Sequence, residues 1–249
     1  TTSRKTQTVR IRLPLTLPEV AHGVTKTLRV ALLDECESCH GSGALAGTAP
    51  TACSSCGGSG EERLVQRSVF GQFVSVQPCR TCQGEGRVID QPCDTCRGEG
   101  RARRETDIEV EVPAGVTSEN FLTLRGRGSV GPRGGPGGNR GDIVVLLEVE
   151  DDARFVRDGH DLIHELPITF AQAALGDEID VPTIEGLARV TIPAGIQSGD
   201  LLRLKGLGLP ELDDHHRGDQ LLNVLLWTPN ELTPEQEEAL RNLRKVESP

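Results

Sequence analysis

Four stretches of the sequence share one pattern: CESCHGSG at residues 36–43, CSSCGGSG at 53–60, CRTCQGEG at 79–86 and CDTCRGEG at 93–100. Each stretch is a C-x-x-C-x-G-x-G unit, and the four units use all eight cysteines of the chain. Two residues between cysteines let one tight turn present both thiolates to a single tetrahedral ion. The glycines allow positive φ, so the chain can fold back with its amides directed at the sulfur atoms. The pattern therefore predicts two closed four-cysteine sites of the structural type, which bind two Zn²⁺ ions.

The segment between the second and third units indicates which pairs share an ion. It reads RLVQRSVFGQFVSVQ at residues 63–77, and its Val and Phe residues on both sides of Gly71 predict a β-hairpin. A hairpin brings its two ends together, so the pairing is expected to be nested. The first zinc site then consists of Cys36, Cys39, Cys93 and Cys96, and the second of Cys53, Cys56, Cys79 and Cys82.

Two other uses of the cysteines are a disulfide framework and thiol–disulfide redox chemistry. The sequence has no N-terminal segment that pairs a basic stretch with an apolar core, as a secretory signal would. A thioredoxin-like site needs a C-x-x-C pair that opens a helix, and none of the four pairs precedes a helical pattern. These observations favour zinc, and a thiol–disulfide oxidoreductase that uses the C-x-x-C pairs is the alternative.

Outside the cysteine units, three short blocks occur twice in the same order. LPLTLPEVAHG at 13–23 resembles LPITFAQAALG at 166–176, an offset of 153 residues, and VPAGVTSENFLTLRGRG at 112–128 resembles IPAGIQSGDLLRLKGLG at 192–208, an offset of 80. A Gly-Asp pair then precedes an apolar stretch at 141–142 and again at 218–219. The two offsets differ by 153 minus 80, or 73 residues, and this interval contains every cysteine. The cysteine-rich region is therefore an insertion into the first of two homologous modules.

Apolar residues alternate with polar ones in both modules, which predicts strands with one buried face. The stretches 17–22 and 170–175 are each long enough for about one helical turn, and Thr233 with Gln236 predicts the capped start of a C-terminal amphipathic helix. The predicted fold is mostly β: two tandem β-sandwich-like modules, the first interrupted by a two-zinc β-hairpin module, and a short C-terminal helix. The predicted domains are a first module at 6–33 and 104–151, a cysteine-rich module at 34–103, a second module at 152–228, and a helix with tail at 229–249.

The composition excludes several classes of protein. The formal net charge is −10, which argues against a nucleic-acid-binding protein. No run of about 18 apolar residues is present, so we expect no membrane span, and we expect a cytoplasmic protein. Six aromatic residues favour several small cores over a single large one. Methionine is absent, even at position 1, so we expect the sequence to be part of a longer chain.

Two motifs suggest chemistry that their surroundings do not support. Residues 126–131 fit G-x-G-x-x-G, but a glycine-rich stretch follows where a dinucleotide site needs a helix. His215 and His216 lie beside Asp213 and Asp214, and the repeat places them in a solvated loop. We find no catalytic centre in the sequence and predict that the protein is not an enzyme.

Four C-x-x-C-x-G-x-G units inserted into the first of two tandem β modules closely resemble the DnaJ family, in particular the C-terminal part of its class A co-chaperones. Shorter matches are VPAGV at 112–116, IPAGI at 192–196, RLKGLG at 203–208 and RDGHDL at 157–162. The J domain with its His-Pro-Asp tripeptide and the Gly/Phe-rich linker are absent from the sequence. We therefore expect this piece not to stimulate a DnaK-type ATPase chaperone by itself.

The resemblance implies a co-chaperone that binds unfolded polypeptides in an apolar groove, prevents their aggregation and delivers them to a DnaK-type chaperone. By position, it assigns client binding to Val9, Leu28, Val30, Leu122 and Phe155. The alternative for these five residues is that they form ordinary core. The resemblance also implies that the C-terminal helix forms a homodimer.

Overall fold

A computed structural model describes residues 8–68, 71–131, 139–212, 214 and 216–246. The chain is mostly β, as the sequence predicts, and short helices account for most of the remaining regular structure. Asp213 and His215, the residues 69–70 and part of the glycine-rich stretch, 132–138, lie outside the described residues. Within the described part, no helix has the length and apolar character needed to cross a membrane.

The chain forms two compact units. The first contains Thr1–Leu13, Thr25–Val110 and Ser118–Leu147, and the second contains Pro14–Val24, Glu111–Thr117 and Glu148–Pro249. Short pieces of the first sequence repeat thus belong to the second unit. The domain boundaries drawn from the repeats stay a prediction.

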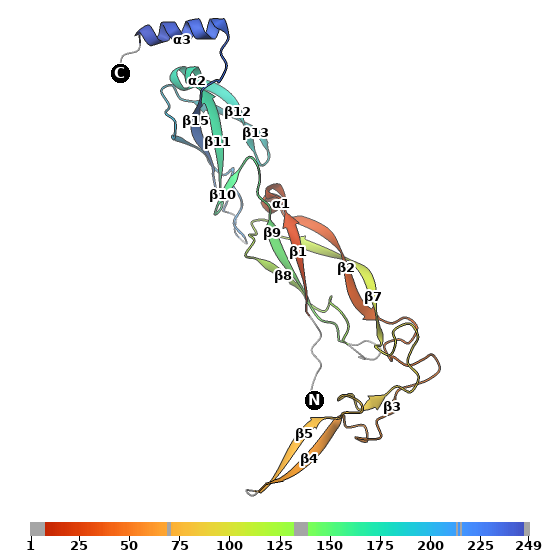
Figure 1. Cartoon of the computed structure of the whole chain (residues 1–249). Helices are drawn as coiled ribbons and strands as arrows, with labels where there is room; N and C mark the ends of the chain where they lie inside the picture. The colour runs from red at the N-terminus through yellow and green to blue at the C-terminus, as the bar shows by residue number, and fades with distance from the viewer. Residues whose placement is uncertain (1–7, 69–70, 132–138, 213, 215, 247–249) are drawn as a thin grey trace. The chain divides into compact units, whose positions relative to one another are not determined.

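The first sequence repeat forms a three-stranded sheet and a separate two-stranded ladder (Figure 1). The sheet has the order β1-β9-β8, from β1 Val9–Leu15, β8 Phe121–Leu124 and β9 Ile143–Val149. The ladder joins β2 Val24–Glu35 to β7 Arg101–Val112. Alternate residues of these strands are buried, including Leu13, Leu32, Val110 and Val145. One face of the sheet therefore contributes to the core and the other faces solvent.

The second sequence repeat has the same architecture. Its sheet has the order β10-β11-β15-β14, from β10 Val156–Asp158, β11 Asp161–Thr169, β14 Leu201–Leu204 and β15 Gln220–Trp227. The hairpin β12 Asp177–Thr183 and β13 Gly186–Ile192 lies outside this sheet. Buried side chains from the sheet and the hairpin form one core cluster, which includes Ile168, Val181, Ile192 and Leu222. The order β1-β9-β8 matches β11-β15-β14, which confirms the internal repeat at the level of topology.

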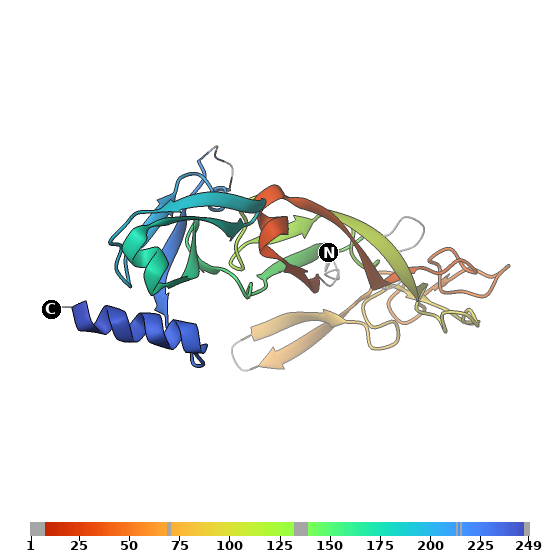
Figure 2. The same cartoon turned by 90° about the horizontal axis from the view of Figure 1, so that it is seen from above.

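The position of the insertion follows from the hairpin of the second repeat. There, β12 and β13 are joined by a tight turn in which Thr183 pairs with Gly186. The corresponding strands β2 and β7 each have 12 residues and continue into the cysteine-rich region. That region contains the two-residue strands β3 Thr51–Ala52 and β6 Arg87–Val88, and a hairpin of β4 Glu61–Ser68 and β5 Gly71–Pro78, which is a two-stranded ribbon in both views (Figures 1 and 2).

Three sequence-based predictions of local structure agree with the fold. Helices α1 Leu17–His22 and α2 Phe170–Leu175 occupy the two short stretches expected to be helical. Helix α3 Pro234–Val246 begins after Thr233, whose hydroxyl accepts a hydrogen bond from the Gln236 amide at 3.3 Å. The hairpin predicted around Gly71 is formed by β4 and β5, and Gly71 is the first residue of β5 and pairs with Ser68.

Candidate metal centres and apolar binding residues

The eight cysteines gather in two groups of four, in the nested arrangement. The Sγ atoms of Cys36, Cys39, Cys93 and Cys96 lie within 4.8 Å of one another, and so do those of Cys53, Cys56, Cys79 and Cys82. All eight are free thiols. Sulfur–sulfur distances across paired units are 3.6 Å for Cys39–Cys96 and 3.8 Å for Cys56–Cys82. Four thiolates about 2.3 Å from a tetrahedral ion would lie about 3.8 Å apart, so both groups have the dimensions of a metal site.

Each group is held by a reciprocal pair of backbone hydrogen bonds between its two units. The amide of Cys36 donates to the carbonyl of Gly100 at 3.1 Å, and the amide of Cys93 donates to the carbonyl of Gly43 at 2.9 Å. In the second group, the amides of Cys53 and Cys79 donate to the carbonyls of Gly86 and Gly60, both at 2.9 Å. The first cysteine of each unit is therefore fixed by the last glycine of its partner unit.

A larger residue does not fit in place of the last glycine of each unit, because its Cβ would clash with the backbone. A Cβ atom on Gly86 would lie 2.4 Å from the carbonyl oxygen of Gly58, and one on Gly100 would lie 2.5 Å from that of Gly41. Each of these glycines donates its amide to a sulfur, Gly86 to Cys82 and Gly100 to Cys96, both at 3.2 Å. Amides directed at the sulfurs stabilise thiolates, so the donor set and its surroundings fit a bound metal ion.

A second contact between paired units joins hydroxyl side chains, which the cysteine and glycine spacing alone does not predict. The hydroxyls of Ser38 and Thr95 are hydrogen-bonded at 2.9 Å in the first group, and those of Ser55 and Thr81 are hydrogen-bonded at 2.9 Å in the second. These residues occupy the same position inside each C-x-x-C pair. A small hydroxyl residue at this position in all four units is the signal that could have identified the contact.

The thiols differ in how readily they ionise without a metal. Burial raises the pKa of Cys39 to about 12. The backbone amide of Cys96 lowers the pKa of Cys93 to about 7. For Cys56, burial raises the pKa, but the amides of Gly60 and Gly58 outweigh it and the pKa falls to about 6. Each group thus contains at least one thiol that ionises readily, Cys93 in the first and Cys56 in the second.

Three of the five residues assigned to client binding lie at the edge of the core. Val9, Leu28 and Leu122 are half-buried and occupy the core-facing rows of β1, β2 and β8. Their exposed parts are apolar surface next to the core. Strand β2 pairs only with β7 among the described strands, so one edge of β2 has no strand beside it.

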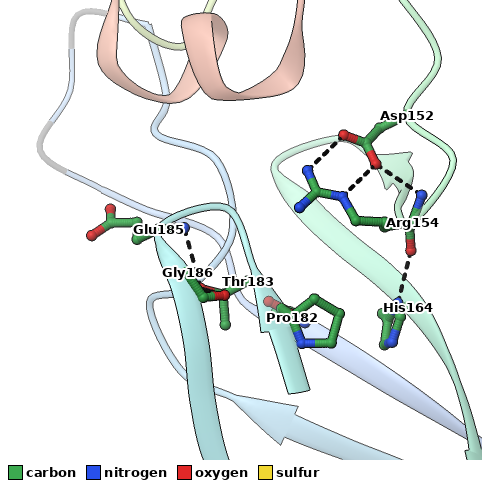
Figure 3. Close-up of polar contacts among 8 residues, drawn as sticks. Asp152, Arg154, His164, Pro182, Thr183, Glu185 and Gly186 are labelled. Carbon is green, nitrogen blue, oxygen red and sulfur yellow. Dashed lines mark hydrogen bonds and ion pairs between the residues drawn. The ribbon is translucent and has the colours of Figure 1, made fainter. Parts of the chain in front are cut away.

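The other two residues, Val30 and Phe155, are packed inside the chain, with exposed fractions of 9% and 3%. The guanidinium of Arg154 lies over the Phe155 ring at 4.9 Å, and the His164 ring lies 5.7 Å from it. Asp152 holds Arg154 with two hydrogen bonds at 2.9 and 3.1 Å, and His164 Nδ1 donates to the Arg154 carbonyl at 2.8 Å (Figure 3). Phe155 is thus buried and covered in this structure, and its assignment to client binding stays a prediction.

The same ion pair alters the titration of its two members. The hydrogen bonds from Arg154 lower the pKa of Asp152, because they favour the carboxylate. In return, Asp152 raises the pKa of Arg154. The charged cover over Phe155 therefore persists across the neutral pH range.

The fold and the two thiol groups define a class: a β protein with two repeated modules, one of which carries an inserted pair of four-cysteine sites. The chain matches the family described as DnaJ C terminal domain over residues 9–229, and it belongs to that family.

Relatives from several bacteria are each named "Chaperone protein DnaJ". The relative from Salinibacter ruber is 48% identical over 239 residues, which are 95% of this chain and 61% of the relative. The relative from Chlorobium luteolum is 44% identical over 240 residues, 96% of this chain and 62% of the relative. The relative from Geobacillus kaustophilus is 43% identical over 243 residues, 98% of this chain and 63% of the relative. The chain thus spans about three fifths of the length of these relatives, and none of their names supports the oxidoreductase alternative.

Proposed function

We propose that the chain is the client-binding part of a cytoplasmic DnaJ-type co-chaperone. It binds non-native polypeptide segments without catalysing a reaction, prevents their aggregation and delivers them to a DnaK-type ATPase chaperone. The family match over residues 9–229 is the observation that carries this proposal. The half-buried apolar side chains of Val9, Leu28 and Leu122, together with the free edge of β2, support it. An extended segment can pair with a strand edge while its side chains enter adjacent apolar pockets.

We further propose that each thiol group holds one Zn²⁺ ion. Four thiolates in a closed tetrahedral set are the donors that Zn²⁺ prefers, and they leave no position open to a substrate. Bound zinc would supply structural cross-links inside a region that contains no large apolar core cluster among its described residues. Homodimerisation through α3 completes the proposal, because this helix exposes Leu240 and Val246 and buries none of its residues.

Replacing Leu28 with serine tests the client site. We expect the variant to bind a chemically denatured model protein more weakly by ~1–2 kcal/mol, or roughly 5- to 30-fold, because apolar surface at the core edge is lost. The measurement is light scattering of the aggregating client at increasing chaperone concentration, with zinc content checked in parallel. Leu187→Ser is the matched control, since Leu187 is 75% exposed on β13 of the second repeat. Equal suppression by the wild type and the Leu28 variant, with the control unchanged, would contradict the proposed site.

Zinc affinity should fall as the pH is lowered. Zinc binds thiolates, whereas Cys39 without metal has a pKa of about 12 and carries its proton at neutral pH. Binding must release this proton, so a higher proton concentration opposes binding and a lower one favours it. Competition with a chelator at about pH 6 and about pH 8, corrected for protonation of the chelator, measures the change. An affinity that does not change with pH would rule out thiol ligands.

A further inference from the structure

The outer face of the β1-β9-β8 sheet has an unusual composition for a solvent-exposed surface. Strand alternation places Arg10 and Arg12 of β1 opposite the core-facing row, and it does the same for Val144 and Leu146 of β9. Phe121 of β8 pairs directly with Leu146, so the two side chains share this face. We call these five residues the basic-apolar face. The central strand β9 thus carries apolar residues on its outer side as well as in the core.

The apolar residues of this face are accessible to a partner. Phe121 is 61% exposed and Leu146 is 37% exposed, although they are cross-strand neighbours. Two such neighbours form a continuous apolar patch, and an apolar side chain of a partner could pack on it. The residue after Leu146 in the outer row of β9 is Glu148, which is polar.

The two arginines of the face are exposed and have no ion-pair or hydrogen-bond partner among the described residues. Two exposed arginines on other strands, by contrast, are paired: Arg29 contacts Asp107 at 3.0 Å and Arg189 contacts Asp180 at 3.1 Å. The chain as a whole has a net charge of −10, with 37 acidic and 27 basic residues. Arg10 and Arg12 thus place two positive charges, unpaired among the described residues, beside an apolar patch of a negatively charged chain, and guanidinium groups are complementary to carboxylates.

The second repeat shows that the fold does not require this composition. In the repeat alignment, Arg10 and Arg12 correspond to Ile163 and Glu165. The pair Phe121–Leu146 corresponds to Leu201–Asn223, which are partners in the equivalent strands. The second sheet thus keeps the architecture and loses both the basic row and the apolar pair. The basic-apolar face is specific to the first repeat.

We propose that the basic-apolar face binds an acidic peptide segment of a partner protein. Carboxylates of the segment pair with Arg10 and Arg12, and an aliphatic or aromatic side chain packs on Phe121 and Leu146. A nucleic acid fits less well, because phosphates gain nothing from aliphatic carbon and the negative chain repels a polyanion. This site is on the opposite side of the sheet from Val9 and Leu122, so it goes beyond client binding and does not depend on it.

The test uses fluorescence anisotropy with the zinc-loaded chain and two fluorescein-labelled peptides, Asp-Leu-Asp-Leu-Asp-Leu and Lys-Leu-Lys-Leu-Lys-Leu. We expect the acidic peptide to bind and the basic peptide not to bind. The double variant Arg10→Glu/Arg12→Glu should weaken binding of the acidic peptide by about tenfold or more, the size of effect that loss of close charge pairs produces. The control Arg80→Glu/Arg87→Glu changes the net charge equally, at exposed positions of the cysteine-rich region. This control should change the affinity for the acidic peptide by less than about twofold.

A second pair of variants separates the apolar contact from the charges. Phe121→Ser should weaken binding, and Leu201→Ser, its equivalent in the second repeat, should leave it unchanged. Unchanged zinc content and thermal unfolding show that a variant is folded, and Arg10→Gln/Arg12→Gln, a milder double change, should show an intermediate loss. Three results would overturn the proposal: equal binding of both peptides, equal effects of the face variant and its control, or tighter binding of oligo-dT that also depends on Arg10 and Arg12.

Discussion

On the proposed assignment of one Zn²⁺ ion to each thiol group, replacing Cys93 with serine should remove one ion from the chain and leave the other. The zinc content should fall from about two ions to about one per chain, because a site with three thiolates loses much of the ~10–16 kcal/mol that binds a structural zinc. Cys93 belongs to the same thiol group as Cys36. Cys36 directly follows the end of β2, and Gly100, the last glycine of the fourth unit, directly precedes β7. This site closes the base of the insertion, so its loss should free both ends of the cysteine-rich region.

Two measurements check this result. A colorimetric zinc assay counts the ions, and limited proteolysis reports whether residues near 36–50 and 90–100 become accessible. Thr95→Ala is the control, since it removes the hydrogen bond to Ser38 in the same group without removing a sulfur ligand. The Thr95 variant should lose ~1 kcal/mol of folding stability at most and keep both ions. A Cys93 variant that still holds two ions would refute the assignment of this group.

The second group should keep its ion in the Cys93 variant. Its reciprocal backbone hydrogen bonds join Cys53 to Gly86 and Cys79 to Gly60, and none of them involves a residue of the first group. The two sites therefore do not share these backbone hydrogen bonds. Loss of both ions from the Cys93 variant would show that the sites fold as one unit.

Replacing Gly100 with alanine should damage the first site without touching a ligand. Gly100 has φ +74°, and an added Cβ would lie 2.5 Å from the carbonyl oxygen of Gly41. The left-handed conformation alone costs an alanine ~1–2 kcal/mol. The clash with the backbone adds ~1–3 kcal/mol, the usual penalty of forcing extra volume into a packed site. We expect a sharp fall in the zinc affinity of this site.

Gly98→Ala is the matched control in the same unit. Gly98 has φ +88°, so its alanine variant has the same conformational cost, but its Cβ would meet only the Pro92 Cβ at 3.5 Å. The zinc affinity of the Gly100 variant should be lower than that of the Gly98 variant by ~2 kcal/mol, or roughly 30-fold. Chelator competition measures both affinities. If the two variants behave alike, the contact between paired units is not what requires glycine at position 100.

The repeat units contained much of the information about the thiol groups. The hairpin at residues 63–77 must bring Cys53 and Cys56 to Cys79 and Cys82, since antiparallel strands of equal length return the chain to its start. The repeated blocks likewise indicated the insertion, the two short helices and the equivalence of the modules. Local patterns were sufficient because turns, caps and alternation depend on neighbours along the chain.

The apolar binding residues were less predictable. The resemblance assigned Val9, Leu28, Val30 and Leu122 to client binding by position, but an alternating strand pattern is the same for a buried residue and for one at the open edge of a core. Exposure depends on which strand ends extend beyond their neighbours. Phe155 lies in no strand, and its cover by Arg154 and His164 depends on how the segment before β10 folds back onto β11.

The sequence by itself determined that eight cysteines form two groups of four, that the groups are nested and that they interrupt one of two repeated β modules. Cysteine spacing and glycine placement are local constraints, so they can be read along the chain. Only the tertiary structure decided how paired units lock through Cys36–Gly100 and Cys93–Gly43, which apolar side chains stay half-open, and that Arg10 and Arg12 lie beside an exposed Phe121–Leu146 pair. These features depend on which strands become neighbours, and strand pairing joins residues far apart in sequence.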